Sequence, residues 1–222
     1  MRCVLHCHSL HSPDSSLPLQ SIIDTCREYN INCVALTDHN EIAGAIELQK
    51  MATDIKVIIG EEVTSKEGHI IGLFLKEKIS AGMPIHDTIR AIRDQGGVVL
   101  LPHPFDRIRP GSVGLKVLTQ VAFEIDFLEI FNARCLLSSD NKKAAAFATE
   151  HRLRPYVGSD AHFASEYTNA ICDMPNFDTP EGFVKSLSQA TFSTRPAGWV
   201  IHVRSNYVRH ISKRITDPKH RI

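Results

Sequence analysis

Short apolar runs alternate with longer amphipathic stretches along most of the chain. The apolar runs predict strands over residues 2–8, 33–36, 56–63, 69–75, 98–101, 127–131, 156–158 and 191–193. Helical spacing predicts helices over residues 18–30, 41–51, 84–95, a short stretch after 114, 142–151, 180–189 and 198–215. Alternation of short buried strands with helices predicts an α/β fold with a mainly parallel sheet and helices outside. About seven such units favour a closed barrel over an open sheet.

The pattern contains no linker, internal repeat or low-complexity segment. We therefore predict one domain over residues 1–197, followed by a C-terminal helix and basic tail over residues 198–222. Residues 204–222 carry six Lys or Arg and one acidic residue. This charge is typical of a solvated helix face with a frayed end, and the alternative is a tail that binds phosphate or a partner.

Composition narrows the function classes. The 222 residues carry 25 basic and 25 acidic side chains, a balance that gives no footprint for nucleic acid or an anionic membrane. No apolar run reaches the ~20 residues of a membrane helix, and the start lacks the long apolar segment of a signal peptide. The six cysteines form no C-x-x-C pair and read as reduced core residues. We expect a cytoplasmic protein with no membrane partner.

Histidine is the compositional outlier, with 12 residues, about half of which end apolar runs. His6 and His8 are two positions apart on a predicted strand, so their side chains share a face and can hold one metal ion. In α/β barrels the carboxyl ends of the strands gather at one face. The groups that fall there are His6, His8, Asp14, His39, Glu62, His69, His103, Asp160 and His162.

This mixture of imidazole and carboxylate suits Zn, Mn or Fe better than Ca or Mg alone, and the absence of cysteine argues against a closed structural zinc site. Nine ligands exceed the needs of one ion, so we expect two or three divalent ions. Closely spaced ions suit phosphoester hydrolysis. A single strand-end histidine is more often a structural hydrogen-bonding residue, and the prediction depends on the joint appearance of all nine.

Neighbouring residues compete for some roles. Strand alternation puts Glu62 on the face of Ile58 and turns Glu61 the other way, which favours Glu62 as the ligand. His11 can be a ligand or an outer group, and Asp38 can orient a ligand. The remaining histidines read as surface residues: His86, His151, His202, His210 and His220.

Three arginines are candidates for binding a substrate phosphate. Arg107 and Arg134 follow predicted strand ends, and Arg195 follows the last predicted strand. The guanidinium group offers a two-pronged match to phosphate. The alternative for each is an ordinary surface arginine.

Several motifs together resemble the PHP (polymerase and histidinol phosphatase) domain, and more narrowly its stand-alone metal-dependent phosphoesterases. The resemblance runs from about residue 4 to 170 and rests on His6-Cys7-His8-Ser9, Ser12-Pro13-Asp14, Leu36-Thr37-Asp38-His39, Gly60-Glu61-Glu62, His69-Ile70-Ile71-Gly72, Pro102-His103-Pro104, Glu129-Ile130-Phe131-Asn132 and Gly158-Ser159-Asp160-Ala161-His162. Val4 stands where the family usually has Asp, the interval from Glu62 to His69 is short, and no insertion domain is present.

The resemblance implies a distorted (β/α)7 TIM-like barrel with a two- or three-metal site. It implies that Asp160 shares one ion with His6 and His8, and that Glu62 bridges to an ion held by His69 and His103. A third ion would lie with Asp14, His39 and His162, and a metal-bridging hydroxide would attack phosphorus. Asp14, Glu62 and Asp160 would then be the catalytic carboxylates.

The expected substrate is a small organic phosphate or nucleotide. One alternative is an exonuclease that acts on short single-stranded oligonucleotides, although the neutral charge and single Trp count against it. A second is a non-catalytic metal-binding PHP module, which typically loses ligands that are present here. A third is an amidohydrolase, whose bridging lysine has no obvious counterpart. Oligomeric state is not readable from the sequence.

Overall fold

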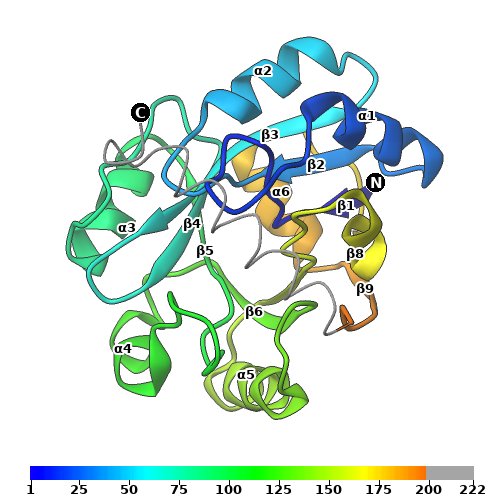
Figure 1. The fold of residues 1–222 in the computed structure, drawn as a ribbon. Coiled ribbons are helices and arrows are strands. Elements are labelled where there is room, and N and C mark those ends of the chain that lie inside the picture. Colours follow the sequence, from blue (N-terminus) through cyan, green and yellow to red (C-terminus); the bar gives the residue numbers. More distant parts are fainter. Residues whose placement is uncertain (199–222) are drawn as a thin grey trace, which may run out of the picture.

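Nine strands form one central sheet in this computed structural model, which describes residues 1–198 of the chain (Figure 1). The strands are β1 (Arg2–Val4), β2 (Cys33–Leu36), β3 (Lys56–Thr64), β4 (His69–Leu73), β5 (Val98–Leu101), β6 (Phe127–Asn132), β7 (Pro155–Gly158), β8 (Ala170–Asp173) and β9 (Thr191–Thr194). The predicted strands are therefore present, with ends shifted by a few residues. β8 is an additional strand that the sequence pattern did not predict.

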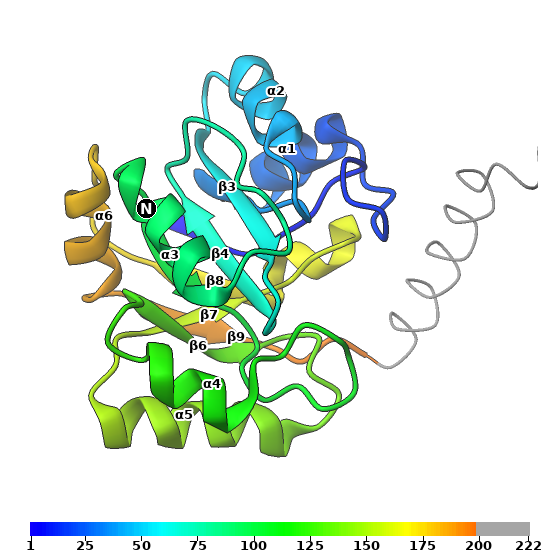
Figure 2. The same ribbon diagram turned by 90° about the vertical axis from the view of Figure 1, so that its left-hand side faces the viewer.

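Helices lie around the outside of the sheet, as Figures 1 and 2 show from two directions. They are α1 (Leu19–Glu28), α2 (Ala43–Met51), α3 (Ile85–Asp94), α4 (Gly114–Val121), α5 (Ser138–His151), α6 (Pro180–Leu187) and the 3₁₀ helix η1 (Ala164–Asn169). Each α-helix turns an apolar side toward the strands, as the helical spacing predicted. Apart from Gly198, the helix predicted over residues 198–215 and the basic tail lie outside the described residues.

The strand order is β7-β6-β5-β4-β3-β2-β1-β8-β9. β1–β2, β2–β3, β5–β6 and β6–β7 pair in parallel, whereas β3–β4, β4–β5, β1–β8 and β8–β9 pair antiparallel. Our expectation of a mainly parallel sheet is therefore corrected to an evenly mixed one. For the β3–β4 and β4–β5 pairs the reason is local: residues 65–68 form a tight connection that turns the chain straight back from β3 into β4, with no helix between them.

The edge strand β7 comes close to β1, which is third from the other end of the strand order, and the sheet forms a nearly closed barrel. A parallel bridge joins Cys7, after β1, to Ala161, after β7. The backbone N–H of His8 donates to the Ala161 carbonyl at 2.8 Å, and the Ser159 hydroxyl donates to the His6 carbonyl at 2.9 Å. These bonds bring the chain after β1 beside the chain after β7, so residues about 150 positions apart share one end of the barrel.

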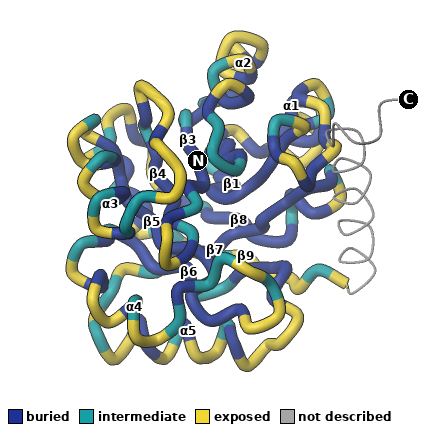
Figure 3. The backbone as a smooth tube through the Cα atoms, turned by 60° about the vertical axis from the view of Figure 1, so that its left-hand side comes forward, coloured by how far each residue is buried: buried dark blue, intermediate teal, exposed yellow. Residues whose placement is uncertain are grey.

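Apolar side chains fill both the interior of the barrel and the layer between sheet and helices. Figure 3 shows buried strands at the centre and exposed outer faces of the helices. One cluster joins Leu5, Phe127 and Tyr156 inside, and another packs α3 and α5 against β4 and β5. Within residues 1–198, no helix has the length and hydropathy needed to cross a membrane.

Candidate metal centre

All nine predicted donor residues lie together at one end of the barrel. Three of them follow β1: His6, His8 and Asp14. Four follow other strands: His39 after β2, His103 after β5, and Asp160 and His162 after β7. The remaining two, Glu62 and His69, lie on the paired strands β3 and β4. His69 begins its strand instead of ending it. Because β4 runs antiparallel to β3, with His69 paired to Thr64, the start of β4 lies at the same end as the other donors.

Glu62 lies at the centre of the group and is 1 % exposed. Its Oε1 lies 2.9 Å from both His69 Nδ1 and His103 Nε2. Its Oε2 lies 3.4 Å from His6 Nε2, 3.2 Å from His8 Nε2 and 3.2 Å from His39 Nδ1. One carboxylate therefore contacts five imidazoles, which is the arrangement expected of a residue that bridges two metal ions.

Two more carboxylates flank Glu62. Asp160 Oδ1 lies 3.7 Å from His6 Nε2 and 3.4 Å from His8 Nε2. On the other side, Asp14 reaches His162 Nε2 at 3.2 Å and His39 Nε2 at 3.5 Å. The donors thus form a continuous patch that runs from Asp160 through Glu62 to Asp14.

Hydrogen bonds from outside the patch orient several of the imidazoles. His6 Nδ1 lies 3.0 Å from Glu129 Oε1, and His162 Nδ1 lies 2.8 Å from the Asp160 carbonyl. If each Nδ1 carries the proton, the lone pair on Nε2 faces the donor patch, which is how a carboxylate or carbonyl usually prepares a histidine for a metal. Glu129 belongs to one of the motifs that resemble the family, but the sequence predicted no role for it. Its residue type and position do not show which side chain it contacts.

Asp38 orients the site indirectly, through two serines. Its Oδ1 accepts hydrogen bonds from the Ser9 N–H at 2.6 Å and the Ser12 hydroxyl at 2.9 Å. The Ser12 oxygen lies 3.1 Å from His8 Nδ1 and also accepts the His39 N–H at 2.9 Å. Asp38 therefore fixes the loop that places two of the donors.

Two donors sit on unusual backbone. His103 has φ of 26° and Asp160 has φ of 50°, a region that non-glycine residues seldom enter. Such conformations cost about 1–3 kcal/mol and persist where the surroundings hold them. Here the His103 N–H donates to Glu129 Oε2 at 2.6 Å, which stabilises the turn at His103.

The electrostatics of the patch favour a cation. Burial opposes ionisation of Glu62 and Asp160, but surrounding imidazoles, and Arg109 beside Asp160, hold the pKa of both carboxyls well below the usual range. Although burial alone would lower it, hydrogen bonds to Asp160 and Glu62 raise the pKa of His8 to about 9. Ionised carboxylates that draw positive charge onto a histidine would also attract a divalent ion.

The donor set fits metal ions by its geometry. Four groups each bring three ligand atoms within 4.8 Å of one another: His8, His39 and His162; His6, Glu62 and His103; His6, His8 and Asp160; and His39, Glu62 and His69. The buried Nε2 atoms of His6 and His8 both face the carboxylates of Glu62 and Asp160, at 3.2 to 3.7 Å. Imidazole nitrogens directed at shared carboxylates are suited to coordinate an ion between them.

The patch is partly open to solvent. His39 and His69 side chains are 16 % and 14 % exposed, whereas those of His6 and His8 are fully buried. A cavity of about 410 Å³ is lined by residues of the loop after β5 and of the starts of α4 and α5, and by none of the nine donors: Phe105, Asp106, Arg107, Ser112, Gly114, Leu115, Ser139, Asp140 and Lys143. One lining residue contacts the backbone of a donor, since the Ser112 hydroxyl donates to the His103 carbonyl at 2.8 Å.

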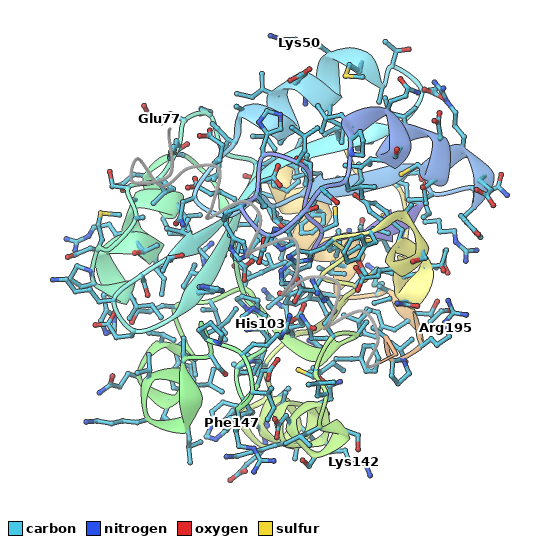
Figure 4. The ribbon with its side chains drawn as sticks, in the orientation of Figure 1. Lys50, Glu77, His103, Lys142, Phe147 and Arg195 are labelled. Carbon is cyan, nitrogen blue, oxygen red and sulfur yellow. The ribbon has the colours of Figure 1, made fainter. Side chains whose placement is uncertain are left out.

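The three predicted phosphate-binding arginines have other partners. Arg107 Nε donates to Asp140 Oδ1 at 3.0 Å. Arg134 is buried, with Nη1 3.4 Å from the Asp160 carbonyl and Nε 3.4 Å from Glu166. Arg195 donates to Asn169 Oδ1 at 3.1 Å, and Figure 4 places it toward the edge of the view, away from the centrally placed His103. Substrate binding by these three residues stays a prediction.

Arg109, which was not among the predicted residues, contacts the side chain of a donor, with Nη1 2.7 Å from Asp160 Oδ2. Sequence position alone does not favour Arg109 over Arg107, since both lie in the same loop.

The other histidines lie apart from the donors. His11 Nε2 lies 3.6 Å from Glu47, which favours the outer role over the ligand role. His86 pairs with Glu124, and His151 stacks on Phe147 at 4.0 Å between ring centroids. His202, His210 and His220 lie outside the described residues.

Comparison with known proteins agrees with this geometry. The family model for the PHP domain matches residues 5–193. An uncharacterized protein of Methanocaldococcus jannaschii is 35 % identical over 202 residues, covering 86 % of this chain and 81 % of the relative.

Two solved structures share the fold at low identity. One is a two-domain protein containing a predicted PHP-like metal-dependent phosphoesterase from Bacteroides vulgatus (TM-score 0.70, 17 % identity, 94 % of this chain and 69 % of that one). The other is PsfC from Pseudomonas syringae (TM-score 0.70, 15 % identity, 95 % of this chain and 98 % of that one). Family match, fold and donor geometry lead to the same conclusion: the chain belongs to the PHP domain family.

Proposed function

We propose that the protein hydrolyses a phosphoester of a small organic phosphate or nucleotide, with the help of two or three divalent metal ions. The observation that carries this proposal is the position of Glu62, whose two oxygens contact five imidazoles, with Asp14 and Asp160 on either side. A carboxylate shared in this way suits closely spaced ions better than a single ion.

Each carboxylate has its own share of the ligands. Asp160 would hold an ion with His6 and His8, and Asp14 would hold one with His39 and His162. Glu62 would join these positions to His69 and His103. When bound, such ions supply a water nucleophile at neutral pH and offset the charge of the phosphoryl group. Zn, Mn and Fe all suit this donor set.

The surroundings of the patch support a small substrate. The exposed edges of His39 and His69 leave one approach for a phosphoryl group. We expect the phosphoryl group to bind at the donor patch by this approach.

The test is a hydrolysis panel with the Mn-loaded full chain. Phosphomonoesters, phosphodiesters and short single-stranded oligonucleotides would be offered, and released phosphate and nucleotides measured. We expect turnover of a monoester that a chelator abolishes. Preferred release of nucleotides would favour the exonuclease alternative, and absence of turnover with Mn, Zn and Fe, despite bound metal, would favour a binding module.

The matched variants are Asp160→Asn and Asp178→Asn. Asn tolerates the positive φ of position 160, so the fold should survive, whereas loss of a carboxylate ligand should lower kcat by more than about 100-fold. Asp178 is 97 % exposed, and its variant should retain full activity. Full activity of Asp160→Asn would refute the metal mechanism.

A further inference from the structure

Arg109 connects the loop between β5 and α4 to the donor patch. Its guanidinium makes three contacts: Nη1 to Asp160 Oδ2 at 2.7 Å, Nε to Asp106 Oδ2 at 2.7 Å and Nη2 to Asn132 Oδ1 at 3.2 Å. The side chain is 24 % exposed. The planar guanidinium has donors on three sides, and each side has an acceptor, so the orientation of the group is fixed.

The two oxygens of Asp160 are used differently because of this contact. Oδ2 accepts hydrogen bonds from Arg109 and from Asn132 Nδ2, the latter at 3.2 Å. Oδ1 lies toward His6, His8 and His162, at 3.7, 3.4 and 3.6 Å. The arginine and the amide thus occupy one oxygen and leave the other facing the imidazoles.

Asp106 holds Arg109 in this position. It is buried, and its Oδ1 accepts the N–H groups of Ile108 and Arg109 at 3.0 and 3.3 Å while Oδ2 takes the guanidinium. One carboxylate therefore shapes the loop and aims the side chain. Arg107, two positions earlier, turns outward to Asp140 instead.

We infer that Arg109 is a positioning residue for the proposed hydrolysis, acting through Asp160. By holding Oδ2 it makes Asp160 a ligand through Oδ1 alone and fixes the angle at which that oxygen meets an ion shared with His6 and His8. Without it the carboxylate can rotate or bind through both oxygens, and the coordination of that ion changes. The inference rests on the proposed metal centre.

Three variants separate this role from others. Arg109→Gln removes the guanidinium group. Arg109→Lys keeps the charge but cannot reach Asp160, Asp106 and Asn132 together, so it should not restore the wild-type behaviour. Asp106→Asn leaves Arg109 in place but weakens its anchor. Arg90→Gln is the control, since Arg90 is an exposed residue of α3 that pairs only with Asp87 among the described residues.

The first readout does not depend on turnover. Full-length protein would be titrated with Co²⁺, whose visible absorption reports ligand number and geometry. We expect Arg109→Gln and Arg109→Lys to share an altered spectrum, Asp106→Asn to lie between them and the wild type, and Arg90→Gln to match the wild type. An Arg109→Gln spectrum equal to the wild type would overturn the inference, even if the hydrolysis panel fails altogether. Should Arg109→Gln not fold, Asp106→Asn decides in the same way.

The second readout is steady-state kinetics on a substrate that the panel identifies. A positioning role predicts a kcat lowered roughly 10- to 100-fold with KM changed less than about threefold. A raised KM with unchanged kcat would overturn the inference, because Arg109 would then contact the substrate in its ground state. The double variant of Arg109→Gln and Asp106→Asn should be no worse than Arg109→Gln alone, since both act through one contact.

Discussion

At the scale of single residues, Glu61 and Glu62 are neighbours with opposite environments. Glu62 faces the imidazoles, whereas Glu61 points to the other side of β3, as strand alternation predicted. There Glu61 Oε2 accepts the Ile79 N–H at 2.8 Å, and its side chain is fully buried. Burial raises the pKa of Glu61 to about 7, so near neutral pH this carboxyl is partly protonated.

This shift predicts a pH-dependent stability. Because the folded state binds the Glu61 proton more tightly than the unfolded state, the stabilisation is complete at pH near 4 and is lost as pH rises through about 7. Glu61→Gln removes the titrating proton and with it this pH dependence. The free energy of unfolding of the variant, relative to that of the wild type, should therefore rise by about 2–3 kcal/mol from pH 5 to pH 8. Urea unfolding of both proteins at pH 5 and pH 8, in the presence of chelator, measures these free energies. The same difference between variant and wild type at the two pH values would contradict the prediction.

Some roles of single residues could be predicted from the sequence, and others could not. The nine candidate donors were predicted by type and by their place near strand ends, and the structure brings them together because a barrel gathers strand ends whatever its detailed packing. Their role as metal ligands stays a prediction. Glu129 and Arg109 were not given roles, since each depends on which neighbour its side chain meets in the folded chain. Arg107 and Arg109 cannot be distinguished before the course of their loop is known.

At the scale of elements, the end of β7 leaves room for a side chain of β6. A Cβ added to Gly158 would lie 1.8 Å from Glu129 Oε1 and 3.0 Å from His6 Cβ. Glu129 needs this space because it also receives the His103 N–H and Asn132 Nδ2. The glycine therefore allows one carboxylate to serve three segments.

Gly158→Ala should displace Glu129 from His6. We expect a loss of about 1–3 kcal/mol in stability from the overlap and roughly 10-fold weaker metal binding from the disturbed histidine. Thermal unfolding and Co²⁺ titration measure the two effects. Gly182→Ala is the control, because its nearest atom would lie 3.4 Å away and alanine favours the helix there. Similar behaviour of the two variants would contradict the steric account.

Element order could be read from the sequence, but strand direction could not. An apolar run such as residues 69–73 has the same pattern whether it runs parallel or antiparallel to its neighbour, so the reversal of β4 was missed. β8 was missed because Ala170–Asp173 follows directly on η1, with no residue between the two elements. Both errors concern connections, which periodicity does not encode.

At the scale of the whole molecule, the donors come from segments that span residues 6 to 162. Ions bound there would join the chain after β1 to the chain after β7 and so favour the folded state. At a free metal concentration of 100 times Kd, one bound ion adds about 2.7 kcal/mol to the free energy of unfolding. For a chain of this size, that raises Tm by roughly 5 to 10 °C. Mn²⁺ or Zn²⁺ should raise Tm by this amount, and chelator should reverse it. A Tm that does not respond to any of these metals would count against the site.

The four donor groups also share their members: His6, His8, His39 and Glu62 each belong to two of them. Separate ions in these groups would therefore compete for, or be bridged by, the same side chains. We expect loading to be a coupled process in which the first ion alters the affinity for the next, so protein isolated without excess metal should be a mixture of partly filled forms. Activity per molecule would rise more steeply than metal content.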